Sequence, residues 1–243
     1  MRAPAAGKDK GGPGRIRERN RQRLLEAAEI EFAERGFDGA TTAAIAARAG
    51  LPKANLHYYF PTKEAVYREL IGGILERWLA ALDPIAESDD PAPSLARYIR
   101  RKMDQAREHP HASRVFAQEV IRGAPVIGDF LAGDLRDWVE IRGQVLAAWA
   151  RQGRMDPIDP AHFFFAVWAA TQTYADFAVQ IDAVLGGEKR REASFEQAKE
   201  QLVRIFLKGC GIALPESGVP LRSRLADATG QEPSGSSSAG GSS

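Results

Sequence analysis

The sequence has few of the residues on which covalent or metal-based chemistry depends. Cys210 is the single cysteine among 243 residues, so an internal disulfide and a zinc site built from several cysteines are excluded. The four histidines, His57, His109, His111 and His162, show no metal-ligand spacing on one helix face. We therefore predict no metal and no cofactor, and Cys210 is interpreted as an inert residue near the end of the last helix.

Long apolar segments are also missing. The longest uninterrupted apolar run covers residues 163–170, whereas a membrane-spanning helix needs about 20 residues. The opening stretch "MRAPAAGKDKGGPGR" lacks the apolar core of a secretory signal. Together with the single cysteine, these absences predict a cytoplasmic protein without a membrane partner.

Features typical of enzymes are equally scarce. No stretch alternates apolar and polar residues as a half-buried strand would, so no glycine-rich phosphate loop can follow one. Serines gather in the terminal "SGSSSAGGSS", which has the composition of a flexible tail and not of a nucleophile turn. The sequence therefore predicts no catalytic residues.

Helical periodicity, by contrast, runs through the body of the chain. Leu25, Ala28 and Phe32 share one helix face, and Gly36 follows where a helix commonly ends in a left-handed residue. Proline and glycine mark the later breaks. Further helices are predicted for residues 41–49, from Pro52, from Thr62 as the cap of a long helix, and for 93–108, 112–122, 127–152, 160–184 and 190–208. The expected fold is all-α, with about nine helices.

The two ends of the chain differ from this body. Residues 1–14 are rich in Gly, Pro and Lys, and residues 213–243 end in Gly and Ser. Such segments bury too little surface to offset the entropy lost on ordering, so both are expected to be disordered. Between them we predict a DNA-binding domain over 15–62 and an effector-binding and dimerisation domain over 63–212.

Charge is distributed unevenly between these parts. Residues 1–63 carry twelve Lys or Arg against seven Asp or Glu, a balance of +5, whereas residues 64–243 carry a balance of −4. Such asymmetry is typical of a chain whose N-terminal part meets a polyanion. A solvated basic segment would produce the same difference, so charge alone does not distinguish these two interpretations.

Residues 41–58 have the layout of a helix-turn-helix, with Gly50 in the turn. The second helix of this motif lies in the major groove of double-stranded DNA. Asn pairs with adenine edges, Lys with guanine or phosphate, and Tyr and His with phosphate oxygens. The residues that fit these roles are Thr42 at the start of the first helix, then Lys53, Asn55, His57, Tyr58, Tyr59 and Lys63.

The stretch "FDGATTAAIAARAGLPKANLHYYFPTKEAVY" resembles the N-terminal domain of the TetR family of transcriptional repressors. The resemblance implies a homodimer that reads an inverted-repeat operator, with 160–184 and 190–208 as dimerisation helices. It implies phosphate contacts for Thr42, His57, Tyr59 and Lys63, and positions facing bases for Lys53, Ala54, Asn55 and Tyr58. His57 replaces a commoner tyrosine, and Ala43 replaces a base-reading side chain of some members, so the operator sequence stays open.

The apolar helix expected over 160–184 contains unexpected polar residues. Gln172 and Asp176 lie four and eight residues after Trp168, so all three share a helix face. Unpaired polar groups are costly to bury. Their partners could lie across the dimer interface, on neighbouring helices or in a pocket filled by a polar ligand.

The C-terminal part, including "LERWLAAL" and "FFFAVWAATQTYADFAVQI", is similar to the effector domain of the pyrimidine-responsive branch of the family. The resemblance implies a small planar effector such as uracil or thymine. Trp78 and Trp168 would enclose its ring, Gln172 would pair with its edge, and Asp176 or Tyr174 would orient these groups. A different planar or hydrophobic metabolite, and a helical interaction protein without DNA binding, are the alternatives.

Overall fold

Helices make up all the regular structure in the computed structural model, which describes residues 13–80 and 85–214. The elements are α1 (Pro13–Gly39), α2 (Thr42–Arg48), α3 (Lys53–Tyr59), α4 (Lys63–Ala80), α5 (Pro91–Glu108), α6 (Pro110–Ile121), α7 (Gly128–Phe130), the π-helical segment η1 (Leu131–Leu135), α8 (Arg136–Arg151), α9 (Pro160–Asp176), α10 (Ala178–Leu185) and α11 (Glu188–Gly209). The predicted all-α fold is confirmed. Among the described helices, none has the length and apolarity needed to cross a membrane.

Three short-range features shape the N-terminal helices. The backbone of Gly36 has φ 69° and interrupts the regular helical conformation of α1 where the sequence predicted its end. Thr41 caps α2 by accepting a hydrogen bond from the amide of Ala44 at 3.1 Å. Pro52 stands just before α3 as its N-cap, one position earlier than predicted, because its ψ of 143° is extended.

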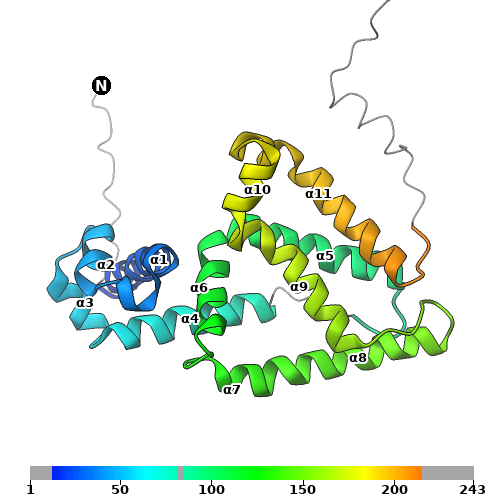
Figure 1. Ribbon diagram of the computed structural model, residues 1–243. Coiled ribbons are helices and arrows are strands. Elements are labelled where there is room, and N and C mark those ends of the chain that lie inside the picture. The colour runs from blue at the N-terminus through cyan, green and yellow to red at the C-terminus, as the bar shows by residue number, and fades with distance from the viewer. Residues whose placement is uncertain (1–12, 81–84, 215–243) are drawn as a thin grey trace, which may run out of the picture.

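Figure 1 shows α1–α3 grouped at one end of the molecule, with α4 leading from them to the remaining helices. A first apolar core joins α1–α4 and includes Leu24, Phe32, Ile45 and Leu56, all fully buried. Val115 of α6 belongs to the same core. We call α1–α3 the head. The head therefore packs against α6 in addition to being connected to the other helices through α4.

A second core lies among α5, α8, α9 and α11. Its large buried side chains include Ile99, Leu146, Trp149 and Phe164. The glycine at 143 allows close packing in this region, since an added Cβ would lie 3.0 Å from Pro160 at the start of α9. Burial of these apolar surfaces is the main stabilising contribution to this half of the fold.

The single helix predicted over 160–184 is wrong at one point, because Phe177 separates α9 from α10. Phe177 has φ −114° and ψ 31°. Arg114 donates to the carbonyl of Ala175 at 3.1 Å, which occupies an acceptor that a continuing helix would use for the amide of Val179. A contact from α6 therefore lies at the end of α9, in a segment that helical periodicity alone would continue.

The helix predicted over 127–152 exists but contains a π-helical turn, from Leu131 to Leu135.

The predicted disordered segments fall almost wholly outside the described residues. Residues 13 and 14 form the start of α1, which places the helix start earlier than expected. The structure shows no core boundary at residue 62, because Val66 and Leu70 of α4 share the core of the head.

One buried carboxylate joins α6 to the first core. Glu119 of α6 is fully buried. It accepts hydrogen bonds from the hydroxyl of Tyr67 in α4 at 3.0 Å and from the amide of Val126 after α6 at 2.6 Å. One position earlier, the side-chain amide of Gln118 donates to the carbonyl of Ala33 in α1 at 3.1 Å. These bonds fix α6 against the head.

Removing the hydroxyl donor should weaken this connection. Tyr67→Phe leaves the ring in place but deprives a buried carboxylate of one partner. We expect the free energy of unfolding to fall by about 1–3 kcal/mol, measured by urea denaturation. The control Tyr58→Phe alters a tyrosine that is 68% exposed and should change stability by less than about 0.5 kcal/mol. Equal effects of the two variants would contradict the role of Tyr67.

Candidate DNA-binding surface and effector cavity

The turn between α2 and α3 is built from backbone geometry that the sequence specifies. Gly50 has φ 65°, which glycine adopts at little steric cost. The amide of Leu51 donates to the carbonyl of Ala46 at 2.9 Å. Arg23 of α1 donates to the carbonyl of Ala49 at 2.6 Å, which ties the turn to the first helix. The orientation of α3 is therefore fixed from two sides.

The helix α3 divides its residues between the core and solvent. Leu56 is fully buried, and Phe60 directly after the helix is 2% exposed. The exposed residues are Lys53, Ala54, His57 and Tyr58, while Thr42 on α2 and Asn55 and Tyr59 on α3 are partly buried. The predicted base-facing residues thus lie on a helix whose inner side anchors it to the head.

Aromatic and cationic side chains extend this exposed surface onto α1. The rings of Tyr58 and Tyr59 meet edge to face with centroids 5.1 Å apart. The guanidinium of Arg17 lies 5.5 Å from the centroid of the Tyr58 ring. The N-terminal part of α1 thus places Arg17 beside α3.

Lys63 has a structural role that its sequence position did not reveal. Its ammonium donates to the carbonyls of Phe37 at 2.8 Å and Ala40 at 3.2 Å. The same nitrogen lies 4.5 Å from the centroid of the Phe37 ring. A cation here satisfies carbonyls that the end of α1 leaves free. Its predicted contact with phosphate stays a prediction.

A cavity of about 60 Å³ opens where α4, α5, α6, η1 and α9 approach one another. Its wall is largely aromatic and aliphatic, with two polar side chains. The lining residues are Leu75, Trp78, Lys102, Phe116, Phe130, Leu135, Trp168 and Gln172. The structure thus brings the predicted residues Trp78, Trp168 and Gln172 to one cavity. The Trp78 and Phe116 ring centroids are 4.9 Å apart.

Trp168 is held in place by the hydrogen bond that its indole N–H donates to the hydroxyl of Tyr98 at 2.7 Å. Burial raises the pKa of the Tyr98 hydroxyl, so this hydroxyl stays neutral and available as an acceptor. The ring of Phe164 lies parallel to Trp168, with centroids 6.1 Å apart and planes inclined by 24°. The orientation of Trp168 is thus determined by second-core residues.

Lys102 is a cavity residue that the sequence reasoning missed. Its side chain is 7% exposed, and its ammonium lies 4.9 Å from the centroid of the Trp78 ring. Burial lowers the pKa of Lys102 to about 8, although the charge of Asp176 acts in the opposite direction. The signal was present in the periodicity, because Lys102 falls in the apolar stripe formed by Leu95, Ile99 and Ala106.

Asp176 contacts a neighbouring helix and does not line the cavity. Its carboxylate accepts a hydrogen bond from the hydroxyl of Ser113 in α6 at 2.7 Å. Burial raises the pKa of Asp176, while the bond to Ser113 and the charges of Arg114 and Lys102 lower it. An orienting influence of Asp176 on the cavity would therefore act through Lys102.

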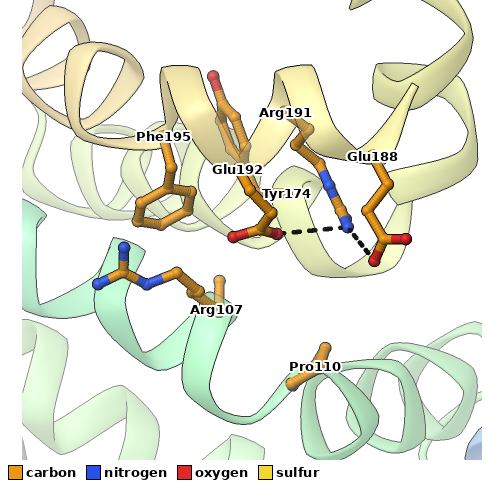
Figure 2. Close-up of a pocket in the computed structure, with 8 residues that line it drawn as sticks. Arg107, Pro110, Tyr174, Glu188, Arg191, Glu192 and Phe195 are labelled. Carbon is orange, nitrogen blue, oxygen red and sulfur yellow. Dashed lines mark hydrogen bonds and ion pairs between the residues drawn. The ribbon is translucent and has the colours of Figure 1, made fainter. Parts of the chain in front are cut away.

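Tyr174 lies in a different place from the one predicted. It lines a separate hollow of about 190 Å³ together with Arg107, Arg191 and Phe195. Figure 2 shows these side chains, with Arg191 directed toward the carboxylates of Glu188 and Glu192. The structure therefore does not bring Tyr174 together with Trp168 and Gln172, which line the other cavity.

The helix-turn-helix, with a helical body that holds a largely apolar cavity, defines the class of protein. The profile described as bacterial regulatory proteins of the tetR family matches residues 24–70, and that of the YcdC-like C-terminal region matches residues 71–213. The chain belongs to the TetR family of transcriptional regulators. It is 42% identical over 186 residues to the HTH-type transcriptional regulator RutR of Escherichia coli K12, covering 76% of this chain and 88% of RutR.

Solved structures share this fold at lower sequence identity. The transcriptional regulator SCO4942 from Streptomyces coelicolor superposes with a TM-score of 0.62 at 24% identity, over 79% of this chain and 98% of its own. The ketosteroid transcriptional regulator KstR2 of Mycobacterium tuberculosis gives a TM-score of 0.60 at 22% identity, over 85% of this chain and 98% of its own. These likenesses concern the fold alone.

The placement of Lys63 leads to a stability test. Lys63→Met keeps an apolar stem beside Phe37 but removes the donor from its carbonyl partners. We expect the free energy of unfolding to fall by about 1–3 kcal/mol, measured by urea denaturation. The exposed control Lys53→Met should change it by less than about 0.5 kcal/mol. Unchanged stability of Lys63→Met, with weaker DNA binding, would indicate a role at phosphate alone.

Proposed function

We propose that this regulator is a repressor that binds an inverted-repeat operator as a homodimer and is released by a small planar effector. A pyrimidine such as uracil or thymine is the effector that we propose. The observation that carries the proposal is the aromatic cavity containing Gln172 and Lys102, one helix away from the DNA-binding head. Acting on bacterial operator DNA, the protein would work in the cytoplasm.

The exposed surface of α3 supports binding to DNA. Lys53 and Tyr58 are exposed. In a helix pair with a purely structural role, these side chains would be packed or paired within the protein. In a helix-turn-helix, the second helix enters the major groove, where Asn55 would read a base edge and Lys53 a base or phosphate. The alternative, a helical interaction protein without DNA binding, does not explain why these exposed polar side chains of α3 lie beside Arg17.

The chemistry of the cavity supports a small planar effector. Trp78 and Trp168 offer flat apolar surfaces. The side-chain amide of Gln172 provides a donor and an acceptor on one edge, which complements the alternating N–H and C=O groups of a pyrimidine.

Release from DNA requires that the effector favour one arrangement of the heads over another. The effector must bind the DNA-incompetent arrangement more tightly, and DNA must then weaken effector binding by the same factor. α6 is suited to this coupling because Phe116 lines the cavity, while Gln118 and Glu119 bond to α1 and α4. A shift of Phe116 would thus displace Gln118 and Glu119, which lie within one helical turn of it and bond to α1 and α4.

The proposed dimer would bury an apolar surface on α9, α10 and α11. Phe165, Val179, Val184 and Ile205 are large apolar residues that are 51% to 82% exposed. Apolar groups gathered on neighbouring helices mark association surfaces in soluble proteins. A two-fold dimer would space its recognition helices by about one turn of DNA, or roughly 34–36 Å, to meet an inverted repeat.

Two substitutions on α3 test how DNA is read. Asn55→Ala should relax the preference at particular base positions, because an amide bonded to a base edge specifies that base. Lys53→Ala should reduce the salt dependence of binding by about one unit if its ammonium meets a phosphate. Fluorescence anisotropy with operator variants at several salt concentrations measures both. A loss by Asn55→Ala that is equal for every operator would contradict base reading.

A substitution in the cavity tests the effector. Gln172→Ala should abolish the release of operator DNA by uracil or thymine while operator affinity stays near wild type, because the amide lies in the cavity and outside the head. Gln144→Ala, at an exposed position of α8, is the matched control and should respond as wild type. The readout is operator binding across a titration of each pyrimidine. Normal release of Gln172→Ala would place the effector elsewhere.

A further inference from the structure

Two lysines of this protein are buried to the same extent but in different surroundings. Lys102 on α5 and Lys199 on α11 are each 7% exposed. The ammonium of Lys199 bonds to Asp104 at 2.9 Å and pairs with Glu196 at 2.8 Å. Burial alone would lower the pKa of Lys199, but these two carboxylates outweigh it and raise the pKa. Lys199 is thus a buried cation with its partners in place.

Lys102 has no comparable set of partners. Within residues 13–80 and 85–214, no side chain or carbonyl accepts a hydrogen bond from its ammonium, which lies along the cavity beside the Trp78 ring. Asp176 of α9 is the charged group whose field reaches it. That carboxylate is already bonded to Ser113 and faces Arg114 of α6. The residues of α4, α7 and η1 that line the cavity are apolar.

An ammonium that lines a largely apolar cavity without a bonded partner among the described residues favours a ligand of defined chemistry. Burying a charge is costly unless it is paired and hydrogen-bonded. A lysine ammonium has three donors and no acceptor, so it accommodates an oxygen that accepts hydrogen bonds and disfavours an N–H group at the same place. Contact with the Trp78 ring supplies only part of this stabilisation.

We infer that Lys102 determines the specificity of the cavity by selecting a planar effector whose edge presents a carbonyl or anionic oxygen to its ammonium. This inference rests on the proposed function of the cavity. Gln172 then reads a second edge of the same ring, and the aromatic side chains hold its faces. A ring that presents an amino group to Lys102 is rejected, because two donors would face each other in a buried site.

The charge requirement makes effector binding depend on pH. In the free protein the pKa of Lys102 is lowered to about 8 by burial, and an accepting oxygen raises it in the complex. Binding is therefore strongest below this pKa and weakens as pH rises above it. At about pH 8.5 roughly a quarter of the lysine is charged, so the dissociation constant for a neutral ligand rises about fourfold.

The test measures uracil binding by calorimetry at about pH 6.5 and about pH 8.5, on wild type and two variants. Lys102→Met should bind uracil about 10- to 100-fold more weakly and lose the pH dependence. Lys102 lies on α5, outside the head, and makes no bond to the described helices α1–α3, so the operator affinity of Lys102→Met should stay near wild type. Lys199→Met controls for the loss of a buried lysine and should follow the wild-type pH profile.

The outcomes separate this inference from the function on which it rests. Wild-type binding of uracil that is equal at both pH values, or undiminished binding by Lys102→Met, overturns the role of Lys102 and leaves the pyrimidine proposal standing. The wild-type pH profile decides the matter even if the variant does not fold. Absence of uracil and thymine binding by wild type at both pH values overturns the pyrimidine proposal and this inference together.

Discussion

The arrangement of this regulator depends on the burial of one carboxylate. Glu119 has no exposed surface, so its oxygens must find donors within the protein. Tyr67 of α4 and the amide of Val126 provide them, and this requirement fixes α6 against the first core. Because α6 also carries Phe116 to the cavity, the wall of the proposed effector site and the support of the head belong to one rigid element.

The apolar helix α9 uses its polar residues in separate ways. Gln172 faces the cavity, whereas Asp176 bonds to Ser113 and acts on Lys102 only through its charge. Tyr174 packs edge to face with Phe195 of α11, with centroids 6.0 Å apart. The polar residues of α9 thus join it to α6, to α11 and to the proposed effector, and one shared ligand does not account for them.

Local signals predicted much of the fold. The threonine cap at residue 62 and the turn at Gly50 follow from short-range geometry, and the structure contains both. The break at Phe177 was not predicted in this way, and the contact found beside it comes from Arg114, 61 residues from its partner Ala175. Lys102 was missed since a long cationic side chain in an apolar stripe is usually interpreted as reaching the surface.

The sequence by itself determined the helices, their caps and the family, because these depend on neighbours within about one turn and on a motif of fixed spacing. The tertiary structure decided which polar groups meet. It placed Lys63 on the carbonyls of α1, separated Tyr174 from Trp168, and brought Lys102 beside Trp78. The physical reason is that hydrogen bonds and charges act over a few ångströms in space, so their partners exist only after distant helices have packed.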